Sequence, residues 1–193
     1  MINLFLSVFD IFKVGVGPSS SHTNGPMVAA SLFLNFIKNR SNIIPGSKSF
    51  FRIKCTLYGS LSFTGKGHHT DKAILHGMAG IIPSSYNEKI GLEIDKEISK
   101  HDHITVKGFP EIKFNPNRDI IFNYGPALKQ HANGMIFSVY DRDENLCSTQ
   151  TYFSVGGGFI KTIKELENPN DLVIDTKVPY PFSTADEMLD LSN

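Results

Sequence analysis

Residues 50–58 read Phe50-Phe51-Arg52-Ile53-Lys54-Cys55-Thr56-Leu57-Tyr58, and this stretch decides the fold class. Its apolar side chains alternate with its polar ones: Phe51, Ile53, Cys55 and Leu57 against Arg52, Lys54 and Thr56. A period of two predicts a half-buried β-strand. This strand would deliver the chain into Gly59.

Helices are predicted on both sides of this strand. Residues 27–40 carry apolar side chains at helical spacing, and Pro26 suits the first helical turn. Residues 70–80 predict a second helix, with Thr70 as its cap and Leu75 and Met78 facing the core. Residues 81–103 are ambiguous, with a short helix expected at 90–99.

Strand patterns dominate the later part of the chain. We expect strands at 104–107, 119–123, 135–140 and 148–155, with the charged run 141–145 as a hairpin loop. Glu187 follows Thr184 by three residues in a capping box that opens a last helix. Because Asn193 follows so soon, we expect that the natural polypeptide continues or that this chain was cut. Mixed helices and strands without an internal repeat predict an α+β fold.

Composition indicates an ordinary globular chain of one domain or slightly more. Its 193 residues are 40% hydrophobic and 20% charged. Lysine and arginine together number 19, as do aspartate and glutamate, so no net charge draws the chain to nucleic acid or to an anionic membrane. Small, neutral partners are the better prediction.

The N-terminal stretch and the cysteines indicate a cellular compartment. Residues 2–16 are apolar but lack a basic n-region and include Asp10 and Lys13, so we interpret them as a buried helix or strand and not as a signal peptide. Cys55 and Cys147 form neither a disulfide framework nor a paired metal-ligand spacing. A reducing cytoplasm fits best.

Four motifs carry the chemistry, and the first is Gly17-Pro18-Ser19-Ser20-Ser21-His22-Thr23-Asn24-Gly25-Pro26. Hydroxyl groups directly before a helix N-terminus suit the binding of a carboxylate, which predicts a small anionic substrate. The alternative is structural: Thr23 or Asn24 caps the helix, and the serines form a solvated loop.

The second motif is Gly65-Lys66-Gly67-His68-His69-Thr70-Asp71, which opens the second predicted helix. Histidine titrates near neutrality and lysine attracts anions, so this motif suits anion binding and proton transfer. Adjacent histidines rarely converge on one ion, which argues against a metal site. The glycines and lysine also lack the full spacing of a phosphate loop.

The third and fourth motifs are shorter. His131-Ala132-Asn133-Gly134-Met135 contains an Asn-Gly turn signal before a strand, and a simple turn is the favoured interpretation. Tyr152-Phe153-Ser154-Val155-Gly156-Gly157-Gly158-Phe159 ends in three glycines. These glycines either allow the backbone to approach a ligand closely or form a flexible exit from the strand.

Together the motifs resemble the N-terminal beta region of bacterial iron-sulfur L-serine dehydratases. The resemblance spans nearly the whole chain and rests on residues 7–10 with 17–23, 58–61 with 64–71, 131–135 and 154–159. It implies a lyase that converts L-serine to pyruvate and ammonia with a 4Fe-4S cluster in place of pyridoxal phosphate. In that reaction one unligated iron acts as a Lewis acid and a base removes the α-proton.

The resemblance also implies site residues and a partner. His22 or His68 would handle the proton; the substrate-binding residues would be Ser19, Ser20, Ser21, Thr23, Lys66, Thr70, Asp71, Asn133 and Gly134. The cluster's cysteine ligands would lie in a C-terminal alpha region outside this chain, so we expect no metal ligands here and no activity from this chain alone. A homo-oligomer is expected as well.

The beta region of this family is similar in fold to the allosteric substrate-binding domain of some phosphoglycerate dehydrogenases. That similarity implies a mixed β-sheet with helices packed on one face. Residues 1–160 would form this domain, and residues 161–193 a linker and the start of a helix toward the alpha region. It also supplies the alternative function, a regulatory module that binds serine or an anion without catalytic groups. A purely structural interaction domain would leave the histidine motifs unexplained.

Overall fold

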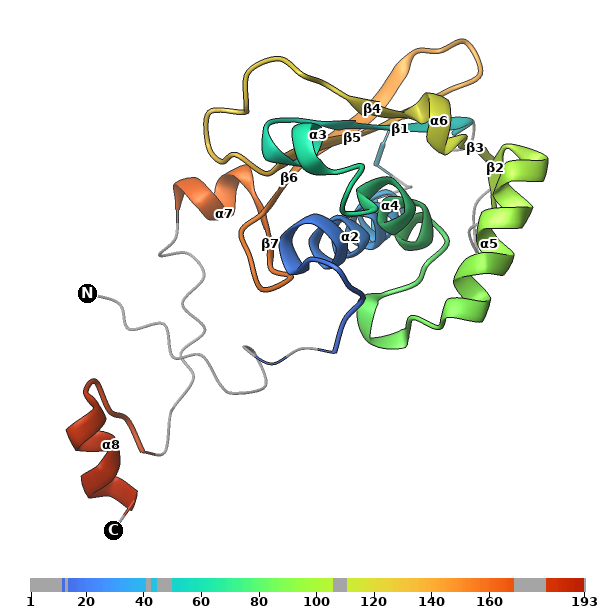
Figure 1. The fold of residues 1–193 in the computed structure, drawn as a ribbon. Helices are drawn as coiled ribbons and strands as arrows, with labels where there is room; N and C mark the ends of the chain where they lie inside the picture. The colour runs from blue at the N-terminus through green and yellow to red at the C-terminus, as the bar shows by residue number, and fades with distance from the viewer. Residues whose placement is uncertain are drawn as a thin grey trace.

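The computed structural model describes residues 12, 14–40, 43–44, 50–105, 111–168 and 180–192, whose fold is drawn in Figure 1. The helix or strand expected at 2–16 lies almost entirely outside these residues, and residues 14–16 belong to neither.

The described residues form a seven-stranded sheet in the order β2-β3-β1-β5-β6-β7, with β4 also paired to β1. Strand β1 runs parallel to β3 and β4 and antiparallel to β5, so the expected mixed sheet is confirmed. The strands are β1 (Arg52–Leu57), β2 (His103–Ile104), β3 (Ile112–Lys113), β4 (Ile120–Phe122), β5 (Gly134–Tyr140), β6 (Leu146–Ser154) and β7 (Ile160–Thr162).

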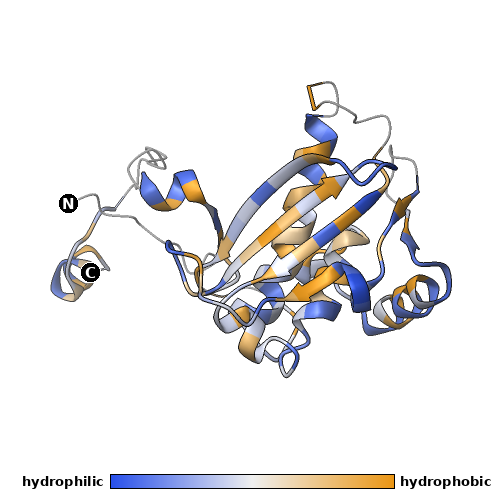
Figure 2. Ribbon diagram, turned by 90° about the horizontal axis from the view of Figure 1, so that it is seen from above, coloured by the Kyte–Doolittle hydropathy of each residue, from blue (hydrophilic) through white to orange (hydrophobic). Residues whose placement is uncertain are grey.

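Helices complete the α+β fold. They are η1 (Ser20–Asn24, a π-helical turn), α2 (Gly25–Asn39), α3 (Ser60–Thr64), α4 (Thr70–Met78), η3 (Pro83–Ser85, a 3₁₀ turn), α5 (Glu88–His101), α6 (Pro116–Asp119), α7 (Ile163–Glu167) and α8 (Ala185–Ser192). Helices α2 and α4 lie side by side below the sheet in Figure 1, and Figure 2 looks onto the opposite sheet face, with these helices behind the strands.

Small residues let α2 and α4 approach closely. A Cβ added to Gly77 of α4 would lie 2.3 Å from the carbonyl oxygen of Met27 in α2, far inside van der Waals contact. The two helices therefore pack closely in one layer, and their N-terminal ends carry the first two motifs.

Alternation along β1 sets the core, as the sequence predicts. Ile53, Cys55 and Leu57 are fully buried, and Phe33 of α2 stacks on Phe137 of β5 with ring centroids 5.4 Å apart. The inward position expected for Phe51 is wrong: its ring is half-buried, with the Nζ of Lys113 lying 4.7 Å from the ring centroid. The adjacent Phe50 is buried instead, at 2% exposure, so the alternation of β1 does not extend to Phe51.

Most of the longer predicted elements are confirmed, with shifted ends. Helix α2 begins at Gly25 with Pro26 in its first turn, and α5 covers the short helix expected at 90–99. Leu75 and Met78 are buried, as predicted. The capping box is present, since the backbone N–H of Glu187 donates to Oγ1 of Thr184 at 3.2 Å.

Three local predictions need correction. Thr70 is not the cap of α4; His69 holds that position with a left-handed φ of 55°, and Thr70 is the first helical residue. Asp119 ends α6 instead of opening a strand. Strand β2 is His103–Ile104, and the remainder of the strand expected at 104–107 lies partly outside the described residues. Within the described ranges, no helix has the length and apolar character needed to cross a membrane.

Candidate functional site

The first two motifs meet at the N-terminal ends of α2 and α4. Oγ1 of Thr23 donates to the carbonyl oxygen of His68 at 2.9 Å, and Oγ1 of Thr70 donates to the carbonyl oxygen of His22 at 2.6 Å. Both threonines are buried, at 3% and 0% exposure. Each motif therefore binds the backbone of the other motif's histidine, which fixes the two loops against one another.

A π-helical turn presents His22 to this junction. Ser19 caps the turn, because its Oγ accepts from the backbone N–H of His22 at 3.1 Å. The imidazole of His22 is held at both ring nitrogens: Nδ1 lies 2.8 Å from Oγ of Ser21, and Nε2 lies 3.0 Å from Oγ of Ser60. Hydroxyl groups can donate or accept, so these contacts fix the orientation of the ring in either tautomer.

His68 lies beside His22, with ring centroids 4.9 Å apart and ring planes tilted by 41°. Nδ1 of His68 lies 2.9 Å from the carbonyl oxygen of Thr64. A carbonyl only accepts, so Nδ1 carries the proton and Nε2 of the neutral ring holds a lone pair. No described residue hydrogen-bonds to that Nε2, and the side chain is half-buried.

Electrostatics favour a neutral His22. Burial lowers the pKa of His22 below its ordinary value of 6.5, and the neighbouring His68 lowers it further. Two imidazoles in contact disfavour a positive charge on both at once. The imidazole of His22 is therefore held in its neutral form more readily than a free imidazole.

The third motif reaches the histidines through the start of α3. The backbone N–H of Ser60 donates to the carbonyl oxygen of Ala132 at 2.9 Å, and the N–H of Tyr58 donates to that of Gly134 at 2.9 Å. Gly59 stands between them with φ 56°, and a Cβ there would lie 2.3 Å from the carbonyl oxygen of Ala132. Only glycine permits this close approach.

The fourth motif completes the convergence. The side-chain amide of Asn133 donates to the carbonyl oxygen of Ser154 at 3.1 Å, and the N–H of Ser154 donates back to that of Asn133 at 3.0 Å. A Cβ added to Gly25, the first residue of α2, would lie 2.1 Å from Oγ of Ser154. All four motifs are thus linked around one junction.

The predicted site residues differ in how directly they join this junction. Those that contact one another across it are Ser19, Ser21, His22, Thr23, His68 and Thr70. Lys66 and Asp71 form an ion pair with each other at 2.5 Å. Ser20 is exposed, Asn133 contributes through Ser154, and Gly134 is buried at the start of β5.

Sequence reasoning assigned no role to Ser60, which contacts His22. The residue stands in a recognised stretch, but a single serine after a tyrosine and a glycine carries no signal of its own. Only the folded chain shows that the serine reaches an imidazole 38 residues earlier.

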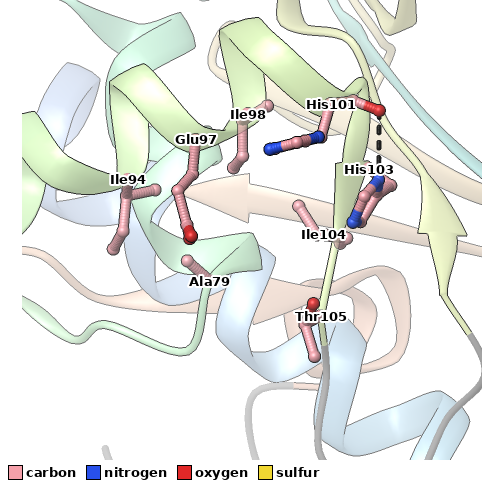
Figure 3. A pocket seen from close by; sticks show the side chains of 8 residues that line it. All are labelled: Ala79, Ile94, Glu97, Ile98, His101, His103, Ile104 and Thr105. Atoms are coloured by element: carbon pink, nitrogen blue, oxygen red, sulfur yellow. Dashed lines mark hydrogen bonds between the residues drawn. The ribbon is translucent and has the colours of Figure 1, made fainter.

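A cavity of about 220 Å³ lies elsewhere, between α5 and β2 (Figure 3). It is lined by Ala79, Ile94, Glu97, Ile98, His101, His103, Ile104 and Thr105, so none of the predicted site residues borders it. Nδ1 of His103 already bonds to the carbonyl oxygen of His101 at 3.0 Å. The cavity is separate from the histidine junction.

The chain's donor set does not fit a 4Fe-4S cluster. Such clusters are held by cysteine thiolates, commonly about four, and the sequence has two cysteines. Cys55 is fully buried in the core, where burial raises the pKa of its thiol well above the ordinary value. Cys147 stands seven residues before Ser154 on β6, which is roughly 23 Å along a strand. Among the described residues, no three His, Cys, Asp or Glu side chains gather to hold a metal ion.

Comparison with known proteins identifies the family. Residues 7–165 match the family described as serine dehydratase beta chain. The chain is 38% identical to L-serine dehydratase of Streptomyces coelicolor over 187 residues, which is 97% of this chain and 40% of that protein. It is 39% identical to L-serine dehydratase 1 of Escherichia coli over 195 residues, again covering 97% of this chain and 40% of the relative.

A third relative agrees: L-serine dehydratase of Helicobacter pylori is 37% identical over 185 residues, which is 96% of this chain and 39% of that protein. The chain therefore spans about two fifths of the length of these curated relatives. The family match and the relatives cover all four motifs of the histidine junction. This chain belongs to the serine dehydratase beta chain family.

Proposed function

We propose that this chain is the beta portion of an L-serine dehydratase, a lyase that converts L-serine to pyruvate and ammonia, and that it supplies substrate-site residues. The names of the relatives support the substrate and the reaction. The observation that carries the proposal is the His22–His68 pair, whose rings lie 4.9 Å apart where the four motifs converge.

The chemistry of serine matches the groups at this junction. Elimination of water from serine needs a base for the α-proton, and the lone pair on Nε2 of His68 suits that task. The hydroxyl groups of Ser19 and Ser21 lie 3.5 Å apart in the turn that presents His22 and suit a carboxylate, while Thr23 holds this turn to the second motif. Lys66 and Asp71 carry charges opposite to those of the substrate's carboxylate and ammonium, and their mutual ion pair would open on binding.

The cluster belongs, in this proposal, to a cysteine-bearing alpha region outside this chain. The two cysteines of this chain do not make a ligand set for the cluster, so we place only substrate binding and proton transfer on its residues. A cytoplasmic location and a homo-oligomer remain predictions.

The decisive experiment measures pyruvate release from L-serine under anaerobic conditions with reconstituted iron. The alpha region is assayed alone and then with this chain added. We expect activity only in the mixture. Full activity of the alpha region alone would contradict the proposal and would make this chain a regulatory module that binds serine or an anion.

A substitution in the mixture locates the base. His68→Ala should lower kcat by about a hundredfold or more, the usual loss for an acid-base group. His69→Asn is the matched control. The side chain of His69, next to His68 in the sequence, is exposed, and asparagine tolerates the left-handed conformation of that position. A change confined to cooperativity or apparent serine affinity would indicate the regulatory role.

A further inference from the structure

Two exposed aromatic rings contact one another where α3 meets the end of β4. Phe63 is 63% exposed and Tyr124 is 62% exposed, and their centroids lie 5.5 Å apart in an edge-on arrangement with an angle of 62°. Phe63 belongs to α3, whereas Tyr124 follows β4 by two residues. Isolated exposed apolar residues need no explanation, but large aromatic rings that gather at a surface mark interaction sites.

Helix α3 connects these rings to the site. Ser60 at its start contacts Nε2 of His22, and the carbonyl oxygen of Thr64 at its end accepts from Nδ1 of His68. Phe63 lies between them on the same short helix, so this exposed ring belongs to the element that contacts both imidazoles.

Lys66 and Phe122 extend the same surface. Nζ of Lys66 lies 4.9 Å from the ring centroid of Phe122, and the lysine side chain is 60% exposed. Phe122 ends β4, two residues before Tyr124. We call Phe63, Phe122, Tyr124 and Lys66 the aromatic rim. It borders the second motif and therefore continues directly from the candidate site.

We propose that the aromatic rim is the surface on which the cysteine-bearing alpha region docks. This rests on the proposed function, because that function requires the cluster-holding residues to come within reach of His22 and His68. The chain's two cysteines cannot supply them. The chain spans only 40% of its relatives, whose remaining length is ample for the occupant. Any region that completes the histidine site must cover the surface beside it.

Affinity between this chain and the separately expressed alpha region tests the proposal. Phe63→Ala combined with Tyr124→Ala should raise the Kd by about tenfold or more, as expected when paired aromatic anchors are removed. Ile90→Ala combined with Leu92→Ala is the matched control, because these side chains are 47% and 52% exposed on α5. Helix α5 lies across the molecule from α3 in Figure 1. The control should leave Kd unchanged within about twofold.

Folding is checked first by urea unfolding, and Phe63→Glu alone provides a second variant that places a charge in the same interface. An unchanged Kd in the folded double variant and in Phe63→Glu would overturn the proposal. So would sedimentation data showing that the rim mediates only self-association of this chain. If the wild-type mixture is active but the rim substitutions leave Kd unchanged, the docking proposal is wrong and the proposed function stands. If binding depends on the rim but no pyruvate forms, the proposed function fails instead.

Discussion

Nε2 of His22 lies 3.0 Å from Oγ of Ser60, a residue that also binds the third motif through its backbone. The N–H of Ser60 donates to the carbonyl oxygen of Ala132 at 2.9 Å. The orientation of the His22 imidazole thus depends on how the start of α3 packs against the turn at 131–134. Ser60 is a positioning residue whose effect on chemistry is transmitted by His22.

Replacing Ser60 should separate positioning from binding. We expect Ser60→Ala to lower kcat of the assembled enzyme between about tenfold and a hundredfold, because a misplaced catalytic group costs that much. KM for serine should change little. Ser62→Ala is the matched control on the same helix, since Oγ of Ser62 is buried without a hydrogen-bond partner in the described structure. Recovery of kcat by Ser60→Thr would support the hydroxyl's role, whereas equal losses in Ser60→Ala and Ser62→Ala would refute it.

His22 should also make stability depend on pH. Burial lowers its pKa below 6.5 in the folded chain, so below that pH the unfolded chain binds a proton that the folded chain does not. The stability present above pH 6.5 is therefore lost as the pH falls toward the folded-state pKa. In His22→Gln this loss should be smaller. Urea unfolding between about pH 5.5 and pH 7.5 measures the free energy of unfolding of both proteins. If this free energy changed with pH equally in the wild type and in His22→Gln, His22 would be excluded as the cause.

Long periodic segments made much of the fold predictable. Helix α2 and strand β1 each repeat their apolar positions often enough to define a period, whereas α5 lies in a stretch whose pattern was ambiguous and is longer than the helix expected at 90–99. Strand β3 has two residues, β7 three and α3 five, too few to show one. Their positions follow from pairing and packing with segments distant in the sequence. The similarity to the phosphoglycerate dehydrogenase domain and the boundary after residue 160 stay predictions.

The site was predictable as a set of motifs and not as a geometry. Resemblance pointed to His22 and His68, but their contact depends on two buried threonine hydroxyls that bridge loops 45 and 48 residues apart. Thr70 shows the difficulty most clearly. Its type and position suggested a helix cap, yet its hydroxyl makes no capping bond in α4 and donates to the carbonyl oxygen of His22 instead. Local propensity cannot reveal a partner that only tertiary packing supplies.

The bond from Thr70 should matter for stability. Thr70→Val keeps the shape of the side chain but leaves the carbonyl oxygen of His22 without this donor, at an expected cost of about 1–3 kcal/mol in the free energy of unfolding. Thr64→Val is the control, because Oγ1 of the exposed Thr64 donates to the carbonyl oxygen of Ser60 within the same helix. That change should cost less than about 0.5 kcal/mol. Chemical unfolding measures the free energy of unfolding of both variants. Equal losses would show that the bond between the two motifs stabilises the fold no more than the bond within α3.

Gly59 joins the strand β1 to the histidine junction, and its backbone admits no side chain. Its φ is 56° with ψ at −131°, and a Cβ there would lie 2.3 Å from the carbonyl oxygen of Ala132. We expect Gly59→Ala to lower the free energy of unfolding by at least about 2 kcal/mol, because strain and a backbone clash act together. Gly67→Ala provides the control, since its added Cβ would meet only the carbonyl oxygen of Thr64 at 3.5 Å. The same clash should displace Ser60 from Ala132 and release His22, so activity of the assembled enzyme should fall even where Gly59→Ala remains folded. A folded Gly59→Ala protein with wild-type stability and kcat would show that the turn adapts without disturbing the imidazole.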